Sequence, residues 1–300
     1  MSHARRVTFS VADAVEHGPA SPKFDLAAEV WRDNAGAICA RGIVHDGHAW
    51  MELPGVAVFH FDRARNTVTA LPERSVADDV LCDTYYRAAL PMALQFFGLE
   101  VLHASAVRTA LGVVAFCAIS ETGKSTTVAA LSSRGYPAWA DDAVPVGIDH
   151  GGSGALAFAV PFRMRLSTAS APKSHDVDDS LRWPAPGPIE LVSTPLAALC
   201  VMQRVDTSRY AAEVRRLSAV EALIALLPHA YCFSLADPDR KRLMMRRYID
   251  LAARVPTFSV TVATGLEKLP AVLDQIESSI PGFTLPMAPA VSDASVGPPE

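Results

Sequence analysis

The segment with the clearest chemical potential is residues 118–126, which read Ala-Ile-Ser-Glu-Thr-Gly-Lys-Ser-Thr. A P-loop reads G-x-x-x-x-G-K-[ST], so Gly123, Lys124 and Ser125 match, while Ala118 replaces the first glycine. Backbone N–H groups and a helix N-terminus bind phosphate in such a loop. Lys124 would reach the β- and γ-phosphates, and the Ser125 hydroxyl would bind Mg²⁺. The pattern therefore predicts an ATP and Mg²⁺ site, and the other residues expected to line it are Ser120, Glu121, Thr122 and Thr126.

A pair of carboxylates follows this segment at a distance that fits the same site. Asp141 and Asp142 end a short apolar stretch, 17 residues after Lys124. A strand–loop–helix–strand unit would bring them beside the phosphates, where a carboxylate can bind Mg²⁺ or accept a proton from an attacking hydroxyl. The alternative is an acidic surface turn.

Glu121 departs most from the expected loop chemistry. It brings a Cβ to a tight turn and a negative charge close to bound phosphates, which like charges repel. Its side chain either points to solvent, weakens nucleotide binding, or helps to hold Mg²⁺ or the acceptor. We expect the outward orientation, because the matching residues Lys124 and Ser125 are typical of a working loop.

Three motifs in order resemble the catalytic domain of HPr kinase/phosphorylase. They are Leu102-His103-Ala104-Ser105-Ala106-Val107, the Gly-Lys-Ser-Thr segment, and the run from Arg134-Gly135-Tyr136 to Ala140-Asp141-Asp142. The chain is more similar to the smaller HPr-kinase-like proteins of bacterial gene clusters, some of which are precursor kinases in lasso-peptide pathways. The motif-bearing part covers about residues 90–166. The family usually has glycine where Ala118 and Glu121 stand.

The resemblance implies an α/β fold: a P-loop kinase core of the HPr kinase and phosphoenolpyruvate carboxykinase type, preceded by a β-rich region. It implies transfer of the ATP γ-phosphoryl group to a serine hydroxyl of a peptide or small protein, including a peptide-natural-product precursor. By the same analogy His103 lies in the active site with Lys124, Asp141 is the general base, and Asp142 supports the metal with Ser125 or the base. Two other functions stay open: a nucleotide-binding module with weak or no catalysis, and a small-molecule kinase.

Composition excludes several classes of protein. The 300 residues carry 27 Lys and Arg against 32 Asp and Glu, a net charge of −5, so no basic surplus indicates nucleic-acid binding. The 50% hydrophobic content argues against a disordered chain. No run approaches the ~20 apolar residues of a membrane span, and the N-terminus lacks a secretory signal. Five scattered cysteines fit a reduced, cytoplasmic protein. The oligomeric state stays open, a homo-oligomer included.

The elements that would position these residues fall into three zones. Residues 1–98 are predicted to be a β-rich region with a helix over 79–97, and residues 281–300 a disordered tail. Residues 99–280 are predicted to be the catalytic domain, with a loop over 167–190. Its predicted strands are 101–107, 111–119, 136–140, 143–148, 155–166, 197–204 and 257–263, and its predicted helices are 126–134, 218–227, 238–253 and 266–279.

Further polar groups have both functional and structural readings. Ser105 shares a strand face with His103, and either packs below the loop or joins the site. Arg163 and Arg165 share a strand face and could clamp a phosphate, although solvated arginines are the more common case. Basic residues 240–242, 246 and 247 read as the wet side of a helix or a peptide-docking face. The His45/His48 pair is interpreted as surface, and the acidic run 175–179 as a solvated loop or a contact for a basic substrate segment.

Overall fold

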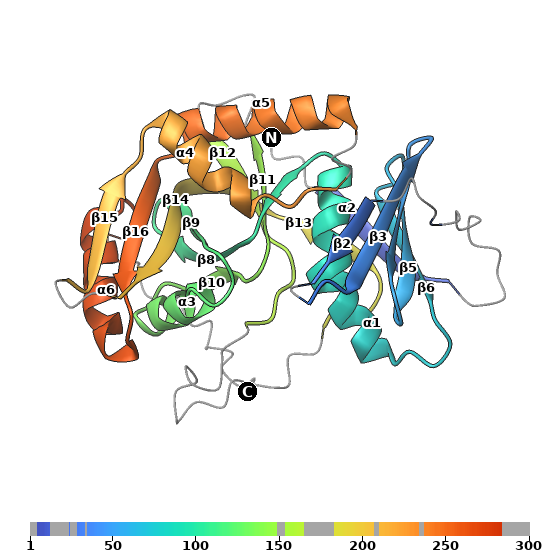
Figure 1. Ribbon diagram of the computed structural model, residues 1–300, viewed down its shortest axis with the longest axis horizontal. Helices are drawn as coiled ribbons and strands as arrows, with labels where there is room; N and C mark the ends of the chain where they lie inside the picture. Colours follow the sequence, from blue (N-terminus) through green and yellow to red (C-terminus); the bar gives the residue numbers. More distant parts are fainter. Residues whose placement is uncertain are drawn as a thin grey trace, which may run out of the picture.

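The computed structural model describes residues 5–12, 24, 29–33, 35–148, 154–164, 183–206, 210–233 and 237–283. The chain is a mixed α/β protein with two mixed β-sheets, which lie in the left and right halves of Figure 1. The α/β fold class is therefore confirmed, and the β-rich start of the chain forms most of the right-hand sheet. No described helix is both long and apolar enough to cross a membrane.

The first sheet has the strand order β13-β1-β6-β5-β4-β3-β2. Strands β1 and β6 are parallel, and the other neighbours are antiparallel. Its strands are β1 (Arg5–Val11), β2 (Glu29–Arg32), β3 (Ile38–His45), β4 (His48–Leu53), β5 (Ala57–Asp62), β6 (Thr67–Pro72) and β13 (Pro188–Leu191).

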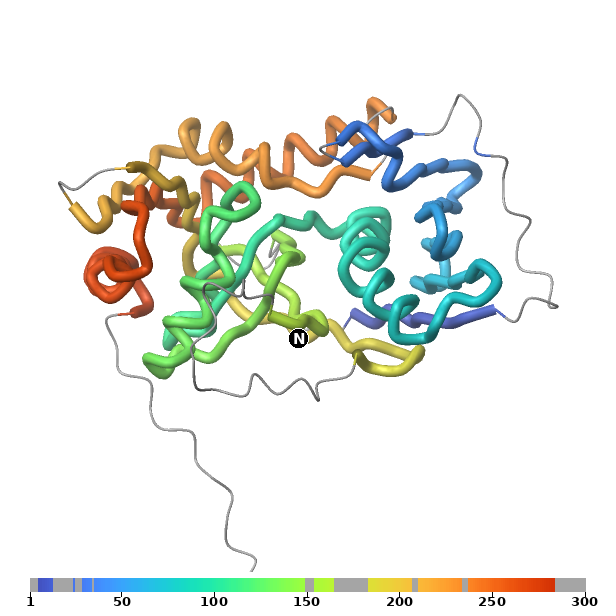
Figure 2. The backbone as a smooth tube through the Cα atoms, turned by 60° about the horizontal axis from the view of Figure 1, so that its bottom comes forward, coloured from blue at the N-terminus to red at the C-terminus, as the bar shows by residue number. Residues whose placement is uncertain are grey.

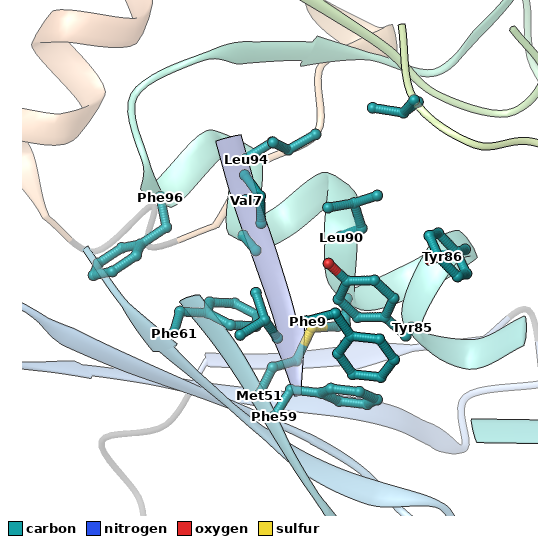
Figure 3. Packing of buried hydrophobic residues seen from close by; sticks show 14 of the residues in the cluster. Val7, Phe9, Met51, Phe59, Phe61, Tyr85, Tyr86, Leu90, Leu94 and Phe96 are labelled. Atoms are coloured by element: carbon teal, nitrogen blue, oxygen red, sulfur yellow. The ribbon is translucent and has the colours of Figure 1, made fainter. Parts of the chain in front are cut away.

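One interrupted helix covers the first sheet, over the range that helical spacing predicts. It consists of α1 (Asp78–Thr84), the π-helical turn η1 (Tyr85–Ala89) and α2 (Leu90–Phe96). Apolar side chains of this helix pack on the sheet, and the rings of Phe9 and Tyr85 stack with centroids 3.7 Å apart (Figure 3). The π-helical turn carries one extra residue, so it changes which side chains face away from the sheet.

The second sheet has the order β10-β8-β9-β14-β12-β11-β7, and β16 and β15 extend it from β14. Strands β9, β14 and β16 are parallel to one another. Its strands are β7 (Glu100–Leu102), β8 (Ala104–Thr109), β9 (Gly112–Cys117), β10 (Ala138–Ala140), β11 (Val144–Ile148), β12 (Ala155–Phe158), β14 (Ser193–Val205), β15 (Ala212–Arg216) and β16 (Thr257–Ala263).

Helices cover both faces of the second sheet. One apolar cluster joins α3 and α6 to one face, and another joins α4 and α5 to the opposite face, because adjacent residues of each strand point to opposite sides. Short 3₁₀ turns, η2 (Leu227–His229) and η3 (Leu266–Lys268), follow α4 and precede α6. The helices are α3 (Lys124–Ser133), α4 (Ala219–Leu226), α5 (Pro238–Arg254) and α6 (Leu269–Ser279).

The basic face predicted on α5 is exposed at Lys241, Arg242 and Arg246, but Arg240 and Arg247 have a different role. Both terminal nitrogens of Arg240 donate to the Glu100 carboxylate at 2.9 Å, and Arg247 donates to the same carboxylate at 3.1 Å. Glu100 is only 3% exposed. These two arginines therefore anchor α5 to β7, while Arg246 remains exposed.

Several predicted boundaries are wrong in detail. The predicted strand 101–107 divides at His103 into β7 and β8, because β7 pairs with β11 while β8 pairs with β9. The predicted strand 155–166 ends at Phe158, and residues 159–164 are irregular. Strands β2 and β15 were not predicted, and β13 lies in a segment predicted to be a loop. Of the predicted tail, residues 284–300 are outside the described part of the chain.

Strand β13 links the two halves of the molecule. It follows strands β7 to β12 of the second sheet in the chain, yet it pairs antiparallel with β1 at the edge of the first sheet. Figure 2 shows this segment in yellow beside the N-terminal strand in blue. The predicted domain division at residue 98 stays a prediction.

Candidate functional site

The 118–123 loop connects β9 to α3 at the carboxyl edge of the second sheet. All six residues of β9 are buried, and α3 begins directly at Lys124. Gly123 precedes the helix with φ +109°, a left-handed conformation that glycine adopts without steric cost. The sequence therefore places a strand, a turn and a helix N-terminus around Lys124, as its pattern predicts.

Lys124 folds back over this loop. Its Nζ donates to the Ala118 carbonyl at 2.9 Å, and the residue is 7% exposed. Burial lowers the pKa of Lys124, although Asp142, Cys117 and Asp141 oppose that shift. The amine is thus held at the loop with few solvent contacts. Its electrostatic attraction for an anion is stronger there than in water.

Asp141 is the centre of a small hydrogen-bonded group. Its Oδ1 accepts from the Ser125 hydroxyl at 2.8 Å and from the Ser105 hydroxyl at 2.5 Å. Asp141 is 5% exposed and follows β10, which runs parallel to β9 with β8 between them. The carboxyl ends of β9 and β10 therefore meet at one edge of the sheet. The hydrogen bond from Ser105 to Asp141 favours the interpretation that Ser105 belongs to the site.

Asp142 faces a different direction from its neighbour. It has φ +66°, and its carbonyl accepts from the Tyr231 hydroxyl at 3.2 Å. Its carboxylate pairs with Arg87 at 3.1 Å, and the residue is one of those that line the cavity containing the loop. The two carboxylates thus differ: Asp141 is bound to serine hydroxyls, whereas Asp142 is bound to an arginine of the first half.

His103 lies between β7 and β8, near the same edge. Its backbone N–H donates to the His229 carbonyl at 2.7 Å. Burial, reinforced by Lys124 and His229, lowers the pKa of His103 to about 4, and Asp141 opposes the shift. His103 is therefore a neutral imidazole at neutral pH, and it lines the cavity.

The residues between Ala118 and Lys124 differ in exposure. Ser120 and Glu121 are exposed, while Thr122 is buried. Glu121 has φ +66°, a conformation that usually favours glycine. Because Glu121 is exposed yet also contributes to the cavity lining, its outward orientation stays a prediction.

The cavity is lined by both polar and apolar residues. Its volume is about 670 Å³, which is in the range of small-molecule sites. Its polar lining includes the loop, Thr126, His103 and Asp142. The apolar side chains in its lining are Met202, Val262, Leu266, Leu269 and Val272. This lining suits a ligand that carries both phosphates and an apolar ring.

Three residues of the site were not predicted from the sequence. Arg204, at the end of β14, donates to the Thr122 carbonyl at 2.8 Å. Arg87 belongs to the π-helical turn, and Tyr231 follows η2. Only the position of Arg204 near a strand's carboxyl end could have suggested a site residue.

The other described polar candidates are not among the residues that line the cavity. Arg163 lies over the Trp183 ring, while Arg165 and the acidic run 175–179 are outside the described residues. His48 Nδ1 and His60 Nε2 are 3.1 Å apart in the first sheet, away from the loop. Within the described ranges, no group of three or more His, Cys, Asp or Glu side chains is placed to hold a metal ion.

Comparisons with known proteins give little beyond this geometry. No protein-family model matches the chain, and no curated protein matches it. The chain is similar to the solved structure of the Hpr(Ser) kinase/phosphatase from Coxiella burnetii, with a TM-score of 0.32 and 12% identity. The match covers 59% of this chain and 88% of that chain. A likeness of this size assigns no role to any residue.

Proposed function

We propose that the protein is an ATP-dependent phosphotransferase that transfers the γ-phosphoryl group to a hydroxyl acceptor. The observation that carries the proposal is the contact of Ser125 with Asp141 beside the buried amine of Lys124. Phosphoryl transfer needs positioning and charge neutralisation more than covalent chemistry, and these groups supply both. The loop amides and Lys124 would bind the phosphates.

Mg²⁺ fits the oxygen atoms of this site. Mg²⁺ usually binds one or two protein oxygens together with substrate phosphates and water, so a larger protein cage is not required. The Ser125 hydroxyl and the Asp141 carboxylate would hold it, and when bound it would neutralise charge on the phosphates. The site needs no other metal ligand from the described residues.

The contacts favour an exchange of the two aspartate roles inferred from the resemblance. The resemblance implies Asp141 as the general base and Asp142 as support for the metal or the base, and both assignments stay predictions. Asp141 already touches the Ser125 hydroxyl, whereas Asp142 is one of the residues that line the cavity. We therefore assign Asp141 to the metal and Asp142 to the acceptor hydroxyl, whose proton it would accept. Neutral His103 lies beside this pair as a hydrogen-bonding group.

The acceptor is the least constrained part of the proposal. A serine hydroxyl of a peptide or small protein, such as a peptide-natural-product precursor, is supported by the resemblance of the three sequence motifs alone. A small-molecule hydroxyl is the alternative within the same chemistry. A nucleotide-binding module without catalysis is favoured by one observation, the glutamate in a left-handed position of the loop at Glu121.

The test is a transfer assay with γ-labelled ATP, Mg²⁺ and a mixed panel of serine peptides and small hydroxyl compounds. We expect label in a phosphate ester, and the identity of the labelled product separates peptide from small-molecule acceptors. Lys124→Ala should abolish transfer and weaken ATP binding, while folding is checked by circular dichroism. A folded Lys124→Ala protein with unchanged transfer would overturn the proposal. ATP binding without transfer to any acceptor would favour the non-catalytic module.

A further inference from the structure

The side of the site that faces the first sheet contains a second group of cations. Arg87 is the first of them, and its Nη1 donates to the Asp142 carboxylate at 3.1 Å. Its Nε donates to Asp83, one helical turn earlier, at 2.9 Å. Both of its hydrogen-bonding edges are thus directed to carboxylates, so Arg87 belongs to the framework of the site.

Trp183 joins this framework from the other side. Its indole N–H donates to the same Asp83 oxygen at 2.9 Å, and its ring stacks on Tyr86 with centroids 4.8 Å apart. The Arg87 guanidinium carbon lies 5.4 Å from the centre of the Trp183 ring. The indole is therefore fixed beside the arginine that contacts Asp142.

Arg163 is the second cation of this group. Its guanidinium carbon lies 5.0 Å from the centre of the Trp183 ring, so both guanidinium groups approach one indole. Its Nε is buried and has no hydrogen-bond partner. Among the described residues, Arg163 has no carboxylate partner, whereas Arg87 has two. The buried Nε can still donate a hydrogen bond, and a half-buried guanidinium is stabilised when a carboxylate pairs with it.

We propose that Arg163, stacked on Trp183 beside the Arg87–Asp142 pair, binds a carboxylate of the acceptor. The inference rests on the proposed function and names the acceptor class: a hydroxyl compound that carries a carboxylate near the hydroxyl. A planar guanidinium on an aromatic ring is a favourable partner for a carboxylate, because its nitrogens donate two parallel hydrogen bonds. Asp142 would then meet the hydroxyl, while Arg163 holds the acceptor's charge away from the phosphates.

The test is a calorimetric titration of the full-length protein in two stages. The protein is first titrated with Mg²⁺ and the β,γ-imido analogue of ATP, which occupies the phosphate site without transfer. The loaded protein is then titrated at fixed free Mg²⁺ with three probes. They are a peptide with serine flanked by glutamates, the same peptide with glutamines, and malate, a small hydroxy-dicarboxylate.

We expect the acidic peptide or malate to bind and the glutamine peptide to bind at least about tenfold more weakly. Binding by only one of the first two probes identifies a peptide or a small molecule as the source of the carboxylate. Arg163→Gln should weaken binding of the acidic probe about tenfold or more and leave the affinity for the nucleotide analogue unchanged. Arg246→Gln, which removes the same charge from an exposed position on α5, is the matched control and should change neither affinity.

The outcomes separate the two claims. If the nucleotide analogue does not bind, the proposed function fails, and the inference fails with it. If the analogue binds but no acidic probe does, or the glutamine peptide binds equally well, only the inference is overturned. Unchanged probe affinity in folded Arg163→Gln protein would also overturn it.

Discussion

At the scale of single residues, the site depends on how two adjacent carboxylates are held apart. Ser105 and Ser125 both donate to one oxygen of Asp141, which fixes the orientation of that side chain. The backbone of Asp142 is left-handed, and the side chain of Asp142 contacts Arg87. Two residues of the same type therefore sit in different environments, and such pairs commonly have different roles.

The Asp141→Asn and Asp142→Asn variants should separate these roles. Asp142→Asn should lower kcat by roughly 10²–10⁴-fold and leave nucleotide affinity unchanged, because a general base acts only on the acceptor. Asp141→Asn should instead raise the Mg²⁺ concentration needed for half-maximal rate. Steady-state kinetics over a Mg²⁺ titration measures both effects. The opposite result, a Mg²⁺ effect for Asp142→Asn alone, would restore the assignment inferred from the resemblance.

His103 predicts a pH dependence of stability. Its pKa is lowered to about 4 in the folded protein, below the ordinary value of 6.5, because of burial and the nearby Lys124. The unfolded chain therefore binds a proton at higher pH than the folded one, so stability from this group is lost as pH falls from 6.5 towards 4. Denaturant unfolding across that range should show the loss.

A His103→Gln variant provides the control for this titration. It cannot take up the proton, so its free energy of unfolding should fall less steeply between pH 6.5 and 4. The pKa of His229 and that of His60 are also lowered by burial, so part of the slope should remain. An identical slope in wild type and His103→Gln would show that His103 does not titrate in this way.

At the scale of elements, a buried ion pair fixes α5 to β7. Glu100→Gln should lower the free energy of unfolding by about 3–5 kcal/mol, because it leaves the guanidiniums of Arg240 and Arg247 without their carboxylate. Urea unfolding is the measurement. The control is Glu190→Gln, which breaks the exposed pair with Arg6 and should cost less than about 1 kcal/mol. Equal losses in the two variants would contradict this difference.

The elements around the loop were predictable from sequence, and those around the acceptor side were not. The apolar run of β9, the Gly123-Lys124-Ser125 pattern and Gly135 after α3 are local signals, and the structure has a strand, a turn and a helix there. The sequence does not show that the predicted strand 101–107 divides at His103, because the residues next to His103 on both sides are buried and apolar. Pairing with two different partners, a tertiary effect, decides it.

The contacts of the site with the first half have no local sequence signal at all. Arg87 is 55 positions from Asp142 in the chain, and their contact depends on the π-helical turn and on how the helix packs. The edge strands β2 and β15 are short and contain no fully buried residue, so apolar periodicity does not reveal them. Packing between distant segments, rather than local pattern, supplies these features.

At the scale of the whole molecule, one apolar core crosses the predicted division at residue 98. The cluster around the first sheet includes buried side chains from the later part of the chain, namely Ala143, Phe158, Val160, Ile189, Leu191 and Phe233. Strand β13 also supplies the hydrogen bonds at one edge of β1. In Figure 1 the sheet and its helix lie beside the second half, and the catalytic aspartate proposed here meets Arg87 across that boundary.

A fragment of residues 1–98 should therefore fail to fold alone. It loses four large apolar partners, Phe158, Ile189, Leu191 and Phe233, each worth roughly 1.5–3 kcal/mol when buried. That sum is comparable with the ~5–15 kcal/mol stability of a whole domain. Thermal unfolding followed by circular dichroism should show no cooperative transition for the fragment. Residues 99–300 supplied as a second chain should restore a transition, because they bring back β13 and these side chains. A cooperative transition in the isolated fragment, with dispersed amide signals in its NMR spectrum, would instead establish residues 1–98 as an independent domain.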